Sequence, residues 1–181
     1  MPARTVPVMP TEAPGNYDTG ALFNATMKAL GDFLENKPIF SGYQVAAQSI
    51  PTGAFTALSI DTEVVDSDAG HSTVTNTSRY TCQVAGLYLL TGNVVFPASG
   101  TGTRGASFAL NGATTTGITG SEQLIAPAPG FATTISPTPT YVRLAVNDFV
   151  SICGFQNTAG AVSTTSIGAA FTSFSVEWIT A

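Results

Sequence analysis

From about residue 43 to the C-terminus, apolar and polar residues alternate in short runs, a pattern typical of strands with one buried and one exposed face. The runs 80–84 and 173–178 show this alternation most clearly. Clusters of Gly, Pro, Asn and Ser separate the runs, and no helical pattern lies between them. Short strands without intervening helices indicate a sandwich or a barrel. The alternation therefore predicts an all-β domain.

Three local signals add detail to this prediction. Residues 87–96 form a longer apolar run, which is typical of a strand buried on both faces. Asn111-Gly112 follows an alternating run and predicts a two-residue hairpin turn. Asn147-Asp148 marks a further turn between two apolar runs.

The N-terminal part has a different pattern. Residues 1–17 contain four prolines and predict an extended arm. Residues 18–36 predict the one short α-helix of the chain, because apolar residues recur there at helical spacing. These residues are Leu22, Phe23, Met27, Leu30, Phe33 and Leu34. Pro38 follows the helix, and we divide the chain into an arm and helix, 1–40, and a β domain, 41–181.

The apolar stripe of this helix needs a partner surface, and two interpretations remain open. The stripe packs onto the sheet of its own chain, or it docks on a larger particle or bundles with copies of itself. The proline-rich arm and Pro38 set the helix apart from the rest of the chain, which keeps the second interpretation as strong as the first.

Charged residues make up only 9% of the chain, against about a quarter in typical soluble domains. Such a surface must be covered by Ser, Thr, Gly and Asn, or be partly hidden against other subunits, and we expect both. The basic residues are scattered, so we expect no nucleic-acid partner. We also expect no membrane partner, because no apolar run has the length of a span and prolines interrupt any signal-peptide core.

One stretch in the middle of the chain carries a family pattern. Residues 78–96 read SRYTCQVAGLYLLTGNVVF. Tyr80, Gly86 and Tyr88 stand at the aromatic, glycine and tyrosine positions of the central strands of the C1q/TNF-like jelly-roll family, which this stretch resembles.

Two later stretches agree with this resemblance. Residues 144–155, LAVNDFVSICGF, are similar to a strand pair of that family, with Asn147 where glycine is usual. Residues 171–179, FTSFSVEWI, are similar to its closing strand, with Val176 in place of glycine. The resemblance covers about residues 50 to 180.

The resemblance implies a C1q/TNF-like jelly-roll sandwich of ten strands that assembles into a compact homotrimer. It also places five large side chains on the inner sheet, where they belong to the core, to the trimer axis, or to both. These are Tyr88, Leu90, Phe174, Val176 and Trp178.

A second resemblance covers the front of the chain. The helical segment 19–40, followed by a C1q-like head containing 61–80, is similar to short virion proteins of phages that infect actinobacteria. Those are minor tail, head-fibre or capsid-decoration proteins. The resemblance implies a structural virion protein, assembled in the cytoplasm of the host bacterium. Its arm and helix would attach it to major capsid or tail proteins, and the alternative is a tail-fibre module that recognises a host surface glycan.

The sequence offers little for catalysis, and we expect no enzyme and no cofactor. His71 is the only histidine and lies in a segment typical of a surface loop, and no G-x-S-x-G motif occurs. Cys82 and Cys153 fall on strand positions and are expected to be free core thiols, although a pairing remains open.

Acidic residues gather in one place. Asp61, Glu63, Asp66 and Asp68 make a weak candidate calcium site, because hard cations prefer oxygen ligands. The segment lacks the Asp/Asn-rich loop with a fixed glycine, so a solvated strand end followed by a turn is the favoured interpretation.

Overall fold

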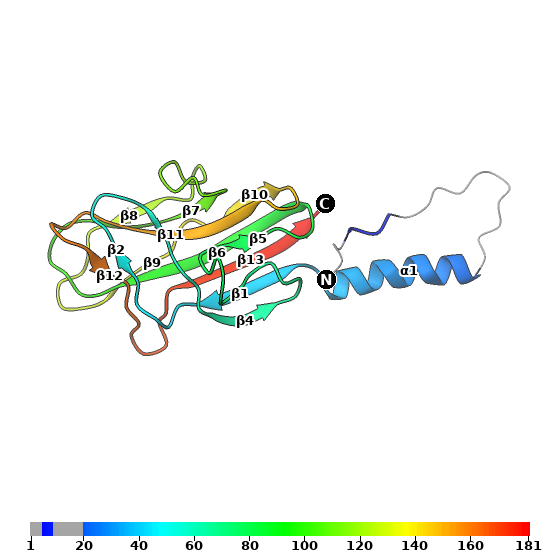
Figure 1. Ribbon diagram of the computed structural model, residues 1–181, viewed down its shortest axis with the longest axis horizontal. Coiled ribbons are helices and arrows are strands. Elements are labelled where there is room, and N and C mark those ends of the chain that lie inside the picture. Colours follow the sequence, from blue (N-terminus) through cyan, green and yellow to red (C-terminus); the bar gives the residue numbers. More distant parts are fainter. Residues whose placement is uncertain (1–4, 9–19) are drawn as a thin grey trace.

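The computed structural model describes residues 5–8 and 20–181. In this part of the chain one helix precedes two facing antiparallel sheets, shown in Figure 1. The elements are α1 (Gly20–Glu35), β1 (Ile39–Tyr43), β2 (Ser49–Ile50), β3 (Thr56–Ala57), β4 (Thr62–Asp66), β5 (Tyr80–Thr81), β6 (Gly86–Phe96), β7 (Arg104–Leu110), β8 (Gln123–Ile125), β9 (Thr133–Ile135), β10 (Thr140–Leu144), β11 (Phe149–Gln156), β12 (Val162–Ser163) and β13 (Ser173–Thr180). The all-β prediction is confirmed.

The larger sheet runs in the order β10-β6-β13-β1-β4. The long strand β6 pairs with β10 along its first part and with β9 along its last part. The C-terminal strand β13 lies between β6 and β1, with Val176 opposite both Leu90 and Phe40. The middle of this sheet is therefore built from the two ends of the β domain together with β6.

The smaller sheet runs in the order β3-β11-β7-β8, and β5 pairs with another part of β11. A short ribbon of β2 and β12 stands apart. The chain passes from one sheet to the other between β6 and β7 and again between β10 and β11. At these two crossings, strands that follow each other in sequence lie in opposite sheets, as in a jelly roll.

The two sheets enclose one core, in which Phe40, Tyr88 and Phe108 are fully buried. Along β13 every second side chain points into this core, and the side chains between them are half-buried on the outside. Strand β6 alternates in the same way at first, and only residues 94–96 are buried in succession. The prediction of burial on both faces therefore holds for the end of β6 and is wrong for its first half.

Helix α1 extends from one end of the sandwich, roughly along its long axis (Figure 1). Phe33 is buried and belongs to the core, and Val6 packs against the same core. In contrast, Phe23, Met27 and Leu34 are exposed. Packing on the sandwich of its own chain thus accounts for Phe33, and for the exposed part of the stripe the second interpretation stays a prediction.

The predicted helix and the observed one agree closely at the C-terminal end, where α1 stops at Glu35. Leu22 lies in α1, but its side chain lies outside the described residues. Of the predicted arm, only residues 5–8 are described. Among the residues that the structure describes, no helix is both long and apolar enough to cross a membrane.

The predicted hairpin at Asn111-Gly112 is wrong in part. Both residues have positive φ, 50° and 79°, and the Ala113 amide donates to the Leu110 carbonyl, so the tight turn forms. The chain after this turn does not pair back onto β7 directly. After the loop 111–122 the next strand, β8, pairs with only the first part of β7, and β11 pairs along the other side of β7.

Candidate subunit interface

The five residues predicted for the inner sheet all lie in the middle of the larger sheet, on β6 and β13. They are Tyr88, Leu90, Phe174, Val176 and Trp178, and each is buried between the two sheets of a single chain. Enclosed side chains leave no surface for a second chain. These five side chains therefore belong to the core, and the surface that this part of the sheet offers to solvent comes from the positions between them.

Those intervening positions form what we call the outer face of the larger sheet, and all of them are half-buried. The outer face consists of Ile39, Ser41 and Tyr43 on β1, Leu89, Thr91 and Asn93 on β6, and Ser173, Ser175 and Glu177 on β13. The same period-two pattern that marks the core also marks this face. Sequence reasoning passed over it because small polar residues look like ordinary solvent-exposed positions.

Polar groups of the outer face bind one another across the strands. The hydroxyls of Ser41 and Ser175 lie 2.8 Å apart, and the Ser173 hydroxyl donates to Oδ1 of Asn93 at 2.6 Å. Groups that are already hydrogen-bonded can lose water without being left unsatisfied. Another protein surface can therefore cover this face at a small desolvation cost.

The outer face carries one charged residue, Glu177, and its carboxylate pairs with the ammonium group of Lys37. Lys37 lies between α1 and β1, at the end of the sandwich from which the helix leaves. An ion pair that already exists in the single chain avoids the larger penalty of burying an isolated charge.

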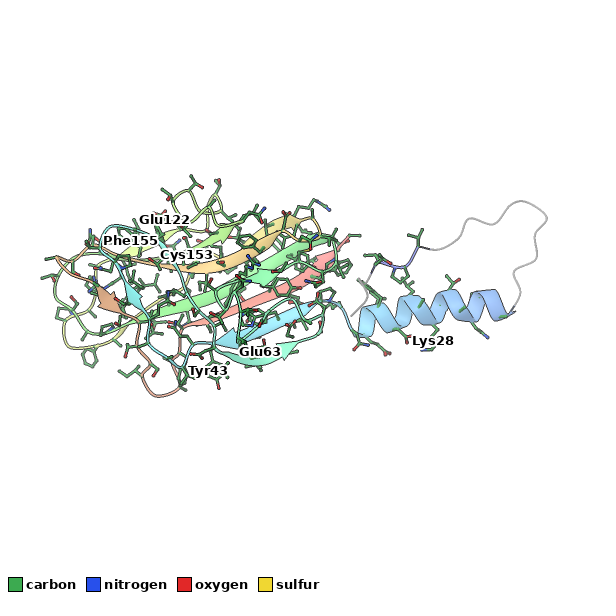
Figure 2. All side chains as sticks on the ribbon, viewed as in Figure 1. Lys28, Tyr43, Glu63, Glu122, Cys153 and Phe155 are labelled. Atoms are coloured by element: carbon green, nitrogen blue, oxygen red, sulfur yellow. The ribbon has the colours of Figure 1, made fainter. Side chains whose placement is uncertain are left out.

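Two adjoining hollows indent the outer face. One, of about 250 Å³, is lined by outer-face residues including Ile39, Leu89 and Ser175. The other, of about 570 Å³, lies farther from the helix and is lined by Tyr43, Phe171 and several small polar side chains. The rings of Tyr43 and Phe171 contact each other with centroids 5.1 Å apart. Tyr43, labelled in Figure 2, lies opposite Thr62 of the neighbouring strand β4.

A different surface exposes apolar side chains. Strands β8 and β10 are the last strands of their sheets, and β9 continues along β6 on the β10 side and contacts β8, so the three make one edge of the sandwich. Leu124, Ile125 and Tyr141 are exposed on this edge, Tyr141 to 62%. The molecule thus presents an outer face with two hollows and, beside it, an edge with exposed apolar side chains.

The four candidate calcium ligands bind separate groups of the protein. Asp61 accepts from the amides of residues 45 and 46, and Asp66 accepts from the amides of residues 70 and 71. Glu63 contacts His71, and buried Asp68 accepts from the Tyr80 hydroxyl. Within the described residues, no three acidic, histidine or cysteine side chains gather as a metal site would require.

His71 is buried, so its prediction as a surface-loop residue is wrong. Its ring stacks on Phe40 with centroids 4.5 Å apart. Nδ1 lies 2.8 Å from Oε1 of Glu63, and Nε2 lies 3.1 Å from the Thr77 carbonyl oxygen. Because both ring nitrogens are occupied, neither is available to take a proton from a nucleophile. The ring instead ties the loop after β4 to the core.

Both cysteines are free, buried thiols, as expected. Burial raises the pKa of Cys153 to about 12, and burial also raises the pKa of Cys82. A nucleophilic cysteine needs the thiolate form near neutral pH. Burial of these two thiols disfavours the thiolate form.

No protein-family model and no curated protein matches the sequence. Solved structures do match the fold. Murine APRIL at pH 5.0 aligns with a TM-score of 0.54 and 13% identity, over 78% of this chain and 98% of APRIL. Murine APRIL at pH 8.5 aligns with a TM-score of 0.53 and 13% identity, over 77% of this chain and 98% of APRIL. The predicted C1q/TNF-like jelly-roll sandwich is thereby confirmed as the fold of this chain.

Proposed function

We propose that this protein is a non-enzymatic structural subunit that forms a homotrimeric jelly-roll knob on a bacteriophage particle. The observation that supports the trimer is that one chain presents two unlike surfaces, the outer face and the apolar edge formed by β8, β9 and β10. When the edge of one copy packs on the outer face of the next, the contact is heterologous, and three such contacts close a ring.

The chemistry of the two surfaces supports this contact. Leu124, Ile125 and Tyr141 are the kind of side chains that fill hollows such as those beside Leu89 and Phe171. A stable interface removes about 800 Å² of surface from each partner. A chain with only 9% charged residues can bury that much surface without trapping many unpaired charges.

The virion assignment is supported by the similarity of residues 19–40 and 61–80 to short phage virion proteins. Residues 1–40 would attach the knob to the particle, and its partners there would be major capsid or tail proteins. Assembly would then take place in the cytoplasm of the host bacterium.

The trimer is tested by the mass of the full chain in solution, measured by light scattering. We expect three chains per particle at micromolar concentration. Leu89→Arg on the outer face and Tyr141→Asp on the edge should each give folded monomers, because a heterologous contact uses both surfaces. Val74→Arg, at a loop residue that is 84% exposed, is the matched control and should remain trimeric. A wild-type chain that stays monomeric would overturn the trimer.

The virion assignment is tested by immunolabelling purified particles of the phage that encodes the chain. Label on the capsid surface would indicate decoration, and label on the tail would indicate a minor tail protein. If the particles carry no label, the chain is not a virion protein.

A second candidate function is recognition of a host surface glycan. The observation in its favour is the 570 Å³ hollow, in which the rings of Tyr43 and Phe171 adjoin Ser41, Asn93 and Ser173. Aromatic rings beside hydroxyl and amide groups suit a sugar ring. Binding of the full chain to host cell-wall glycan should fall at least tenfold in Phe171→Ala and not in Phe131→Ala, a loop residue outside the hollow.

A further inference from the structure

Helix α1 carries an apolar seam with the spacing of a coiled coil. The seam consists of Phe23, Met27, Leu30 and Leu34, whose separations are four, three and four residues. This is the d-a-d-a part of a heptad pattern. At 100° per residue, the four positions fall within about 60° of the helix circumference. They therefore form one straight, narrow stripe.

Among the residues that the structure describes, the seam is exposed to solvent along much of its length. Phe23 is 52% exposed, Met27 46% and Leu34 61%, and Leu30 is half-buried. Exposed apolar side chains in a continuous stripe mark an interaction surface. The heptad spacing of this stripe suits another helix as the partner. The exposure is also uneven around the helix, since Phe33, one position outside the seam, is the residue that packs on the head.

The charged residues of α1 lie on the other side of the helix. Lys28 and Asp32 form an exposed ion pair of 2.7 Å, and they occupy the b and f positions of the heptad. Figure 2 shows Lys28 on the helix, well away from the sandwich. In a helix bundle these positions face solvent.

Residues 5–8 also leave the seam free. Thr5 and Pro7 line a shallow hollow with Ala29, Asp32 and Phe33 of the helix. Those three helix residues lie at the c, f and g positions, on one flank and the outer side. The described N-terminal segment therefore packs beside α1 without covering the stripe.

The head fixes the direction of the helix. Phe33 packs on Trp178 of β13, and Lys37 pairs with Glu177 of the same strand. Three residues separate α1 from β1, which is part of the outer face. The helix thus leaves the sandwich at the end of the proposed subunit interface and runs on along the same axis (Figure 1).

We propose that the α1 helices of three chains form a parallel three-stranded coiled coil that continues the axis of the trimeric head. This inference rests on the proposed homotrimer. A helix of 16 residues is marginal by itself in water, so it needs the head. Three helices held by a trimeric head meet at an effective concentration in the millimolar range, which is enough to stabilise a short bundle.

Cysteine cross-linking of the full chain tests the bundle. Met27→Cys and Leu30→Cys place a thiol in the seam, and Ala25→Cys places one on the exposed opposite side as the matched control. The native thiols, Cys82 and Cys153, are buried and do not compete. Under mild oxidation, the seam variants should form disulfide bonds at least tenfold faster than the control, because seam thiols of neighbouring chains lie close together. The product is a disulfide-linked dimer, because one cysteine per chain can join only two of the three chains.

The mass of each variant is measured before oxidation, which separates the two proposals. A trimer in which the seam and control cysteines cross-link at equal rates, or not at all, overturns the coiled coil and leaves the trimeric head intact. A monomeric wild-type chain overturns the proposed function and the bundle with it. Leu30→Asp should lower the helical circular dichroism signal while the mass stays that of three chains.

Discussion

Phe33, in the last turn of α1, meets Trp178 of β13 edge to face, with ring centroids 5.1 Å apart and planes at 82°. The Trp178 indole also donates its Nε1–H to the Ala85 carbonyl at 3.3 Å. This contact joins a helix near the N-terminus to the last strand of the chain. The helix is therefore attached to the head by packing as well as by the peptide chain.

Phe33→Ala should loosen the helix from the head. We expect the free energy of unfolding to fall by about 3 kcal/mol, the lower end of the range for buried Phe-to-Ala changes, because the site lies at the end of the core. Trp178 is the only tryptophan, so its emission reports the contact directly and should shift to longer wavelength. Lys28→Ala, at an exposed helix position outside the seam and away from the head, should leave the emission unchanged. An unshifted spectrum in Phe33→Ala would contradict the packing.

Asn147 has a φ of +74°, in the left-handed region that favours glycine. It lies in the turn that the Asp148 amide closes on the Ala145 carbonyl at 3.0 Å. Asn147→Ala should destabilise the fold by about 1 kcal/mol, the cost of a Cβ in this conformation. Asn147→Gly should be neutral or slightly stabilising. Urea midpoints of the two variants check this, and equal losses in both would show that the turn conformation is not the cause.

The fold could be predicted because successive side chains of a strand point to opposite faces, so buried and exposed residues alternate along each strand of a sandwich. Strand β13 shows both the success and the limit. Its buried residues, including Val176, were recognised as inner-sheet positions, but Ser175 beside it was not recognised as part of a face. The alternation of apolar and polar residues along a strand distinguishes core positions from surface positions. It does not indicate which part of the surface a second chain covers.

Non-local contacts account for the other differences. The Asn111-Gly112 turn forms as its local chemistry dictates, but the chain that follows it pairs with β7 only at Arg104–Ala106, and β11, far along the chain, supplies the longer pairing of β7. His71 lies in a polar segment, yet it is buried, because its two ring nitrogens hydrogen-bond with the Glu63 carboxylate and the Thr77 carbonyl. Neither partner is visible from the residues next to His71.

The two thiols should be inert in the folded protein. Because burial raises the pKa of Cys153 to about 12 and also raises that of Cys82, both stay protonated at mildly alkaline pH. A disulfide reagent at about pH 8 should therefore react at least a hundredfold more slowly with the native chain than with the chain in denaturant. Rapid reaction of either thiol in the native chain would contradict its burial.

Asp148 links two turns of the head and should give the fold a component of acid sensitivity. Its carboxylate accepts from the Asn111 side-chain amide at 2.9 Å and from the Ala145 backbone amide at 2.8 Å. These bonds, the first above all, lower the pKa of Asp148 below 3.8. Since the folded pKa is the lower one, the stabilisation is fully present above the unfolded value and is lost as the pH falls through the folded value.

Asp148→Ala removes this contribution and leaves the other acids in place. The variant should unfold at lower urea concentration than the wild type near neutral pH, and the difference between the two should shrink as the pH falls through the lowered pKa of Asp148. The effect is small because the carboxylate is exposed to solvent, so the two chains are compared at each pH rather than across pH. A difference that stays constant down to about pH 2 would mean that Asp148 acts through something other than its charge.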